Sequence, residues 1–207
     1  PDVRHPRVIV AEGKAVITDF DIASDGLYYR ERDGAVSRLM RTSLEGAHTL
    51  ILSLPFAGNV YGPVTDLQRP GALFNMQGWT RPAQLYAYDP LNNSTNNTGL
   101  LPPSSIDTSQ LDSQEVVATS YDGTRVPLSI FYRKGIKLDG SHPTIIEGYG
   151  SYGIVLDATF RPSSVGTFSL YFSPSSDSPA TIWPPVTTGI YGPGDSLMKP
   201  PGLYRFG

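Results

Sequence analysis

The sequence predicts a mixed fold in three parts: about two four-stranded antiparallel blades of a β-propeller, the first strands of an α/β domain, and an irregular tail. Short apolar segments recur between glycine turns from Ala15 to Leu54, which indicates a β-meander. The β-branched and aromatic run Val126–Tyr132 precedes Thr144–Ile146, an apolar run of the kind buried in α/β sheets. The predicted parts are 1–105, 106–160 and 161–207.

The first blade is predicted from four apolar segments that tight turns separate. Asp25-Gly26, Asp33-Gly34 and Glu45-Gly46 mark these turns. Together the segments span about 40 residues, the size of one propeller blade. A blade cannot bury both of its faces alone, so further blades are expected beside it. The four expected strands are Ala15–Ile22, Leu27–Arg32, Val36–Ser43 and Thr49–Leu54.

A second, fainter set of strands follows, at Val60–Leu67, Ala72–Met76 and Gln84–Tyr88. Asn92–Thr98 is predicted to be a polar loop, because asparagine, serine and threonine favour turns. This loop contains formal glycosylation sequons at Asn92, Asn93 and Asn96, and an unmodified turn is the favoured interpretation. Leu101–Ser105 is the expected linker to the second part.

The second part is predicted to begin with a hairpin. Val116–Ser120 and Val126–Tyr132 flank Asp122-Gly123, a dipeptide typical of two-residue turns. Lys134–Gly140 carries two glycines and three charges, as expected of a solvated connection, and leads to the strand at Thr144–Ile146. That strand runs into a crowded glycine turn, Gly148–Gly153, at the edge of the predicted sheet.

Composition excludes several classes of function. A net charge of −3 with no basic run argues against nucleic-acid binding, which needs clustered cations. The absence of cysteine excludes disulfides, a thiol nucleophile and cysteine-bound zinc. The most hydrophobic window, Thr49–Ala57, is far shorter than a membrane span. Pro1–Arg7 has no apolar leader. We therefore expect a soluble protein with no membrane partner and slightly favour the cytoplasm. We also expect that the chain lacks its natural start.

Three segments of the second part carry a resemblance to a known family. Glu115–Ser129, Tyr132–Thr144 and Gly148–Gly153 together resemble the start of the catalytic domain of the prolyl oligopeptidase family of serine peptidases. Upstream, Val8–Leu44 and Arg69–Pro90 resemble the end of that family's β-propeller. The resemblance implies a propeller gating an α/β-hydrolase site, cleavage of short proline-containing peptides after proline, and no metal or organic cofactor.

The glycine turn holds the residues that the resemblance implies in function. A tyrosine hydroxyl stays protonated at neutral pH and can donate to charge developing on a carbonyl oxygen. The family's tyrosine at the position of Tyr149 has this role, although from the residues alone a core tyrosine at a strand end is the favoured interpretation. Tyr152 matches an aromatic position against the substrate's proline. Gly148, Gly150 and Gly153 are expected to permit the backbone conformations of the turn.

The remaining catalytic groups of a serine peptidase are missing from the sequence. There is no Gly-x-Ser-x-Gly elbow, and Ser151, which has Tyr149 two residues before it, is predicted to be a turn residue. The three histidines, His5, His48 and His142, are expected to be structural or solvated rather than catalytic bases. The chain thus lacks the Ser/Asp/His triad, and we expect it to be inactive alone.

The tail does not continue the family pattern after Phe160. It contains eight prolines and eight serines between Arg161 and Gly207 and shows no sustained strand or helix period. Where the resemblance implies a further strand and an Arg-Gly-Gly segment, the sequence has Pro184–Gly189 and Pro200–Gly202. A shifted reading frame or a mis-joined exon is the leading interpretation.

Two other functions were weighed. Gly148–Gly153 also fits the spacing of a dinucleotide fingerprint, but the proline that follows at Pro162 leaves no helix to meet a pyrophosphate. The alternative of a non-catalytic β-propeller interaction module is opposed by its incomplete blades, since exposed sheet edges favour aggregation over recognition.

Overall fold

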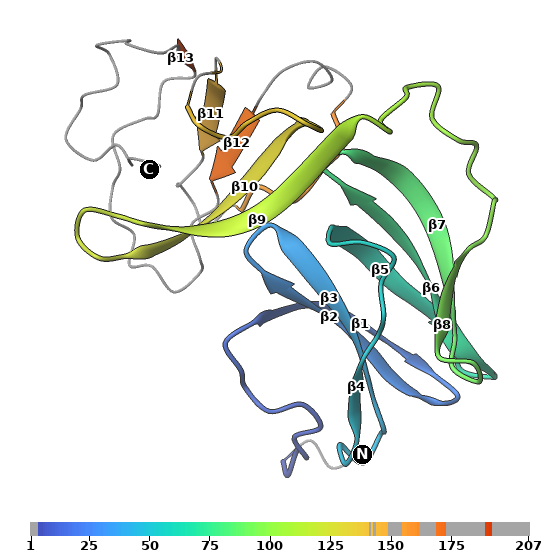
Figure 1. Ribbon diagram of the computed structural model, residues 1–207. Coiled ribbons are helices and arrows are strands. Elements are labelled where there is room, and N and C mark those ends of the chain that lie inside the picture. Colours follow the sequence, from blue (N-terminus) through green and yellow to red (C-terminus); the bar gives the residue numbers. More distant parts are fainter. Residues whose placement is uncertain are drawn as a thin grey trace. The chain divides into compact units, whose positions relative to one another are not determined.

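The computed structural model describes residues 4–140, 142, 144–148 and 155–161, and the strands at 169–172 and 189–191. Within these residues every regular element is a β-strand (Figure 1). The chain forms two compact units. The first comprises Pro1–Gln77 and Ala83–Pro103, and the second comprises Gly78–Pro82 and Ser104–Gly207.

The first unit contains two four-stranded antiparallel sheets, which we call blade 1 and blade 2. Their strand orders are β1-β2-β3-β4 and β5-β6-β7-β8, so each is a meander in which chain neighbours pair. Blade 1 consists of β1 (Val16–Ala23), β2 (Gly26–Asp33), β3 (Val36–Thr42) and β4 (Thr49–Ile51). Blade 2 consists of β5 (Asn59–Asp66), β6 (Arg69–Gly78), β7 (Arg81–Asp89) and β8 (Ser94–Asn97).

The predicted strands of both blades are confirmed, and one prediction of a loop is wrong. Ser94–Asn97, inside the polar segment Asn92–Thr98, is strand β8, whose Asn97 pairs with Tyr86 of β7. β8 is the last strand of its sheet, and edge strands commonly carry polar side chains. Its composition therefore resembles that of a turn. Asn93, with a φ of 48°, makes the turn that precedes it.

Blades 1 and 2 share one hydrophobic core. Aromatic rings dominate it: Phe74 stacks on Tyr86 with centroids 5.9 Å apart, and Tyr28 meets Tyr88 edge-on at 6.0 Å. Burying one such side chain stabilises the fold by about 1.5–3 kcal/mol. The cluster contains Ala23, Tyr28, Leu39 and Leu52 from blade 1 and its flank, and Val60, Ala72, Phe74, Met76, Tyr86 and Tyr88 from blade 2.

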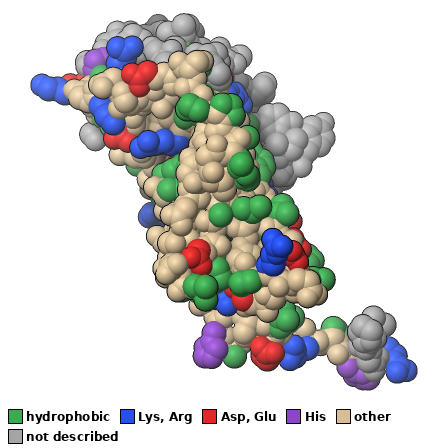
Figure 2. Space-filling view, turned by 90° about the vertical axis from the view of Figure 1, so that its right-hand side faces the viewer, with side chains coloured by type: hydrophobic (Ala, Val, Ile, Leu, Met, Phe, Trp, Pro, Cys, Tyr) green, Lys and Arg blue, Asp and Glu red, His purple; other side chains and the backbone are tan. Residues whose placement is uncertain are grey.

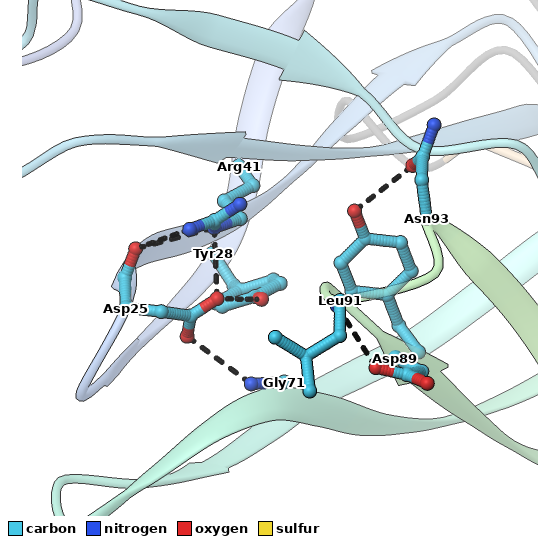
Figure 3. A network of polar contacts seen from close by, with 8 residues as sticks. Asp25, Tyr28, Arg41, Gly71, Asp89, Leu91 and Asn93 are labelled. Carbon is cyan, nitrogen blue, oxygen red and sulfur yellow. Dashed lines mark hydrogen bonds and ion pairs between the residues drawn. The ribbon is translucent and has the colours of Figure 1, made fainter.

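Asp25 joins the two blades at one end of this core (Figure 3). Its carboxylate accepts a hydrogen bond from the Tyr28 hydroxyl at 2.8 Å and another from the backbone N–H of Gly71, on β6, at 3.1 Å. The Arg41 guanidinium lies 2.9 Å from the same carboxylate, and both groups are mostly buried. Asp25 was predicted only as a turn residue, and the structure adds this cross-blade role.

The second unit is built on a five-stranded sheet with the order β13-β11-β12-β10-β9. The predicted hairpin is confirmed and is longer than expected: β9 spans Leu111–Thr119 and β10 spans Arg125–Arg133. β11 covers Thr144–Gly148, and its neighbours are β12 (Ser169–Phe172) and β13 (Gly189–Tyr191). The last two strands qualify the prediction that 161–207 is irregular, because they pair within the sheet.

Candidate functional site

The candidate site lies at the carboxyl end of β11, where the predicted glycine turn begins. β11 runs parallel to β12, and Gly148 is paired with Phe172, so the two strands end together. In α/β sheets, ligands bind beyond the carboxyl ends of parallel strands, because the loops that leave there can converge on one point. This sheet edge is therefore a suitable position for reactive groups.

Among the predicted site residues, only Gly148 lies within the described part of the chain. It is the half-buried last residue of β11. Tyr149, Gly150, Ser151, Tyr152 and Gly153 lie outside the described residues. Their proposed roles consequently stay predictions.

An ion pair links the two described segments on either side of the glycine turn. Arg161 Nη1 lies 3.4 Å from Glu147 Oε2, one residue before the end of β11. Both side chains are partly exposed, so solvent screens the attraction and the pair contributes about 1 kcal/mol or less. The ion pair therefore serves to hold Arg161 near the end of β11 more than to stabilise the second unit.

The three histidines lie at exposed positions. His48 precedes β4 in a loop of blade 1, and His142 precedes β11. The carbonyl oxygen of His142 accepts a hydrogen bond from the Thr144 hydroxyl at 3.1 Å, which fixes the entry into β11. His5 is also exposed.

A second polar cluster in the same unit centres on Glu115, on β9. Its carboxylate accepts a hydrogen bond from the Ser129 hydroxyl at 2.6 Å and one from the Trp79 indole N–H at 3.3 Å. Ser129 lies directly opposite Glu115 in the β9–β10 ladder. Trp79 stacks on Phe131 with ring centroids 5.8 Å apart and an angle of 14°. Trp79, Ser129 and Phe131 are all buried.

The environment of Glu115 favours its neutral form. Glu115 is an exposed residue as a whole, but burial of its carboxyl group raises the pKa of that group, and the hydrogen bonds from Ser129 and Trp79 lower it only in part. No cation accompanies these two donors among the interactions that set this pKa. The cluster can thus accept hydrogen bonds and take up a proton, and it holds the turn at Trp79 against the sheet.

Sequence reasoning did not identify Trp79, Ser129 or Phe131 as important. The predicted hairpin brought Ser129 close to Glu115 but did not give the register: counting outward from a two-residue turn at Asp122-Gly123 pairs Ser129 with Val116, whereas the ladder pairs it with Glu115. No comparable pattern pointed to Trp79, because it is 36 residues from Glu115 in the chain. Contacts of that separation depend on tertiary structure.

The described residues show neither a group of metal-binding side chains nor a helix that could span a membrane. They contain no group of three or more His, Cys, Asp or Glu side chains placed to hold a metal ion. In the same part of the chain, no helix has the length and apolar character needed to cross a bilayer.

Comparison with curated proteins finds several peptidases, whereas no protein-family profile matches. The chain is 28% identical over 128 residues to a prolyl endopeptidase of Elizabethkingia meningoseptica, covering 61% of this chain and 18% of that protein. It is 26% identical over 136 residues to an uncharacterized peptidase of Rickettsia prowazekii, covering 63% and 18%. A dual function macrocyclase-peptidase of Amanita bisporigera is 30% identical over 98 residues, covering 46% and 13%. The chain thus spans less than a fifth of the length of these relatives.

Solved structures show the same arrangement of strands. One chain from a study of two prolyl endopeptidases matches 80% of this chain with a TM-score of 0.68 and 24% identity, over 25% of its own length. Prolyl oligopeptidase B from Galerina marginata, bound to a 25mer macrocyclization substrate, matches 81% of this chain with a TM-score of 0.68 and 21% identity, over 24% of its length. These matches establish similarity of fold.

Proposed function

We propose that this chain is a fragment of a member of the prolyl oligopeptidase family and supplies part of a serine-type endopeptidase or oligopeptidase that cleaves short peptides after proline. Its curated and structural neighbours include prolyl endopeptidases and a prolyl oligopeptidase. In this proposal, 1–105 is the end of a β-propeller and 106–160 is the start of the α/β-hydrolase domain. The natural partners of the whole protein are short proline-containing peptides.

The observation that supports the proposal is the end of β11, which the glycine-rich segment follows in the sequence. Tyr149 directly follows β11, at an edge where two parallel strands end in register. A phenol placed there can donate a hydrogen bond to the oxyanion of a tetrahedral intermediate. Tyr152, three residues later, can offer a flat ring to a proline side chain. Removal of one oxyanion donor typically lowers kcat by about 10²–10³.

This chain alone is proposed to be inactive, since the sequence contains no serine elbow to supply the nucleophile. Purified chain should therefore leave a chromogenic peptide with proline before the scissile bond intact. Hydrolysis that rises in proportion to the concentration of the chain, and that survives repurification, would contradict the inactivity.

A graft tests the role of Tyr149 in an active enzyme. Residues 115–160 of this chain would replace the corresponding segment of the Elizabethkingia prolyl endopeptidase, which would supply the missing catalytic groups. We expect an active chimera in which Tyr149→Phe lowers kcat by about 10²–10³ and changes KM little, because the lost hydrogen bond forms mainly in the transition state.

Two further variants of the chimera serve as controls. Tyr121→Phe, at the exposed tip of the β9–β10 hairpin, should leave kcat and KM unchanged. Tyr152→Ala should raise KM for proline-containing peptides more than it lowers kcat, since it removes a binding surface. An active chimera whose kcat is insensitive to Tyr149→Phe would refute the proposed role of this tyrosine.

A further inference from the structure

The segment Gly78–Pro82 belongs to the second unit, although the strands on either side of it belong to blade 2. It contains the end of β6, a turn, and the start of β7. Trp79 and Thr80, at its centre, are buried. The contacts of the Trp79 indole therefore help to hold this segment, which we call the Trp79 segment, to the second unit.

Two contacts of different kinds hold the indole. Its ring lies nearly parallel to that of Phe131, with the centroids 5.8 Å apart, and this apolar contact does not depend on pH. The indole N–H donates a hydrogen bond to Glu115 Oε1 at 3.3 Å. An indole N–H can only donate, and a buried donor that loses its acceptor is costly. The docking of Trp79 thus depends on a titratable group.

The neutral carboxyl group of Glu115 can satisfy every partner in this cluster. Its Oε2 lies 2.6 Å from the Ser129 hydroxyl, a group that can donate or accept. When a proton from water binds Oε2, that oxygen donates to Ser129 Oγ, and Oε1 still accepts from the indole. The hydrogen bonds of the cluster therefore survive protonation, and no charge remains beside the buried rings.

The described side chains next to Glu115 on its face of the β9–β10 hairpin are uncharged. They are Ser113, Val117, Pro127, Ser129 and Phe131. The charged residues of this face, Arg125 and Arg133, lie at the two ends of the ladder. Arg81, in the Trp79 segment, is exposed and is not among the groups that set the pKa of Glu115. By contrast, several acidic side chains on the surface shown in Figure 2 lie next to Lys or Arg.

An ionised Glu115 can leave the cluster for water. β9 is the last strand of its sheet, and Glu115 as a whole is exposed. Its side chain can therefore turn into solvent without a change in the backbone of β9. Burial raises the pKa of the carboxyl group, which is the direction expected where the docked position suits the protonated form better than the ionised one. Once the carboxylate turns away, the indole N–H loses its acceptor.

We propose that Glu115 is a proton-controlled latch for the Trp79 segment: the protonated carboxyl group keeps the indole docked on the β9–β10 hairpin, and the ionised carboxylate turns to water and loosens the segment. Docking should be firmest in acid, because a group with a raised pKa contributes stability below its ordinary pKa, near 4.5, and loses it as pH rises through the raised one. The docking equilibrium should fall about tenfold for each pH unit between the two pKa values. The inference does not depend on the role of Tyr149.

Acrylamide quenching of Trp79 fluorescence in the full chain tests the latch. The sequence has two tryptophans, and Trp183→Phe, at a position outside the described residues, leaves Trp79 as the only one. From about pH 4 to about pH 8 we expect the quenching constant to rise along the titration curve of a single group. Hydrogen exchange of the β9 and β10 amides at the same pH values would verify that the hairpin stays folded.

Two substitutions of Glu115 in this protein should abolish the pH dependence in opposite ways. Glu115→Gln keeps an oxygen for the indole and an amide N–H for Ser129 Oγ, so Trp79 should stay protected at every pH. Glu115→Ala removes the acceptor, so quenching should be high at every pH. Ser129→Ala removes a donor that favours the ionised form and should move the midpoint of the rise to higher pH.

Asp112→Asn is the matched control. Asp112 is an exposed residue of the same strand on the opposite face from Glu115, so this variant should show the unmodified rise in quenching. Quenching that does not change with pH in the Trp183→Phe protein would overturn the proposal. A rise that persists in Glu115→Gln, a protected indole in Glu115→Ala, or a rise accompanied by lost protection of the β9 and β10 amides would equally overturn it.

Discussion

The first unit holds its central carboxylate with a cation, whereas the second unit holds its own with neutral donors. Asp25 receives a guanidinium, a hydroxyl and a backbone N–H, and two of these partners, Tyr28 and Arg41, belong to the same blade. Glu115 receives a hydroxyl and an indole N–H. Both carboxylates join segments distant in sequence, but only that of Asp25 has its charge compensated by an ion pair.

The difference shows two ways of holding a carboxylate. The mostly buried side chain of Asp25 lies beside the cation of Arg41, whereas Glu115, an exposed residue of β9, is held by neutral donors. Burial raises the pKa of the Tyr28 hydroxyl, and its hydrogen bond to Asp25 raises it further, so this donor remains protonated. For Glu115, by contrast, the raised pKa means that the carboxyl group takes up a proton more readily in the folded unit than in the unfolded chain.

The largest expected effect is on packing around Glu115. Trp79→Ala removes the ring that stacks on Phe131 and one donor to the carboxylate, and it should destabilise the second unit by about 3–5 kcal/mol. Hydrogen exchange of the β9 and β10 amides during urea unfolding would measure this loss. Tyr121→Ala, at an exposed position of the same hairpin, is the matched control and should change stability little.

Removal of the Asp25 charge should be nearly as costly in the first unit. Asp25→Ala leaves the largely buried Arg41 guanidinium without its counter-ion, at a cost of about 3 kcal/mol. Asp33→Ala breaks the ion pair with Arg38, whose partners are both exposed, and should cost about 1 kcal/mol or less. The midpoints of urea unfolding, followed by hydrogen exchange of the backbone amides of the blades, would compare the two substitutions. Equal effects of the two substitutions would abolish the contrast between buried and exposed pairs.

The carboxyl group of Glu115 should make the stability of the second unit depend on pH. Folded Glu115 binds its proton more tightly than the unfolded chain does, where the pKa is near 4.5. The stability of the second unit should therefore fall as pH rises from about 4.5 through the raised pKa. Glu115→Gln keeps the size of the side chain and removes its titration, so this part of the slope should vanish. Asp122 acts in the opposite direction, because hydrogen bonds from Thr124 lower its pKa.

The contribution of the Glu115 carboxyl group to the pH dependence is therefore the difference in stability between the unmodified chain and the Glu115→Gln variant. Unfolding midpoints of both proteins from about pH 4, near the usual pKa of a glutamate, to about pH 8 would supply this difference. Parallel curves of unfolding midpoint against pH for the two proteins would show that Glu115 has the same pKa in the folded and the unfolded chain.

The smallest expected effect concerns the turn before β8. The side-chain oxygen of Asn93 accepts a hydrogen bond from the Tyr88 hydroxyl at 3.0 Å, and the backbone φ of 48° is unfavourable for most residues. Asn93→Ala should destabilise blade 2 by about 1 kcal/mol, measured by thermal unfolding. Asn93→Gly, which tolerates this φ, should cost less, and the reverse order would exclude a backbone contribution.

The strands of this fold could be predicted from the sequence because local patterns determine them. The turns at Asp25-Gly26 and Asp122-Gly123 separate runs of strand-forming residues, and both hairpins are present. β8 was missed because its composition is that of a polar turn and only pairing with β7 makes it a strand. Recognition of the family rested on extended matching segments, and the neighbours found agree with it.

The polar clusters could not be predicted because their members come together only through tertiary contacts. Asp25 and Gly71 are 46 residues apart in the chain, and Trp79 is 36 residues from Glu115. These separations along the chain are far longer than the repeat of a helix or a strand, so no periodic pattern in the sequence relates the paired residues. For the candidate site, the sequence predicted a glycine turn, and the structure describes only the end of the strand that precedes it in the chain.

The second unit is discontinuous in sequence, which determines how it can be studied in isolation. A polypeptide that begins at Ser104 omits Gly78–Pro82, and with it the indole that covers Phe131. Limited proteolysis at the Pro103–Ser104 junction would leave that short segment attached to the other product. Recombinant dissection of this protein therefore requires either the intact polypeptide or a permuted one that carries residues 78–82 along.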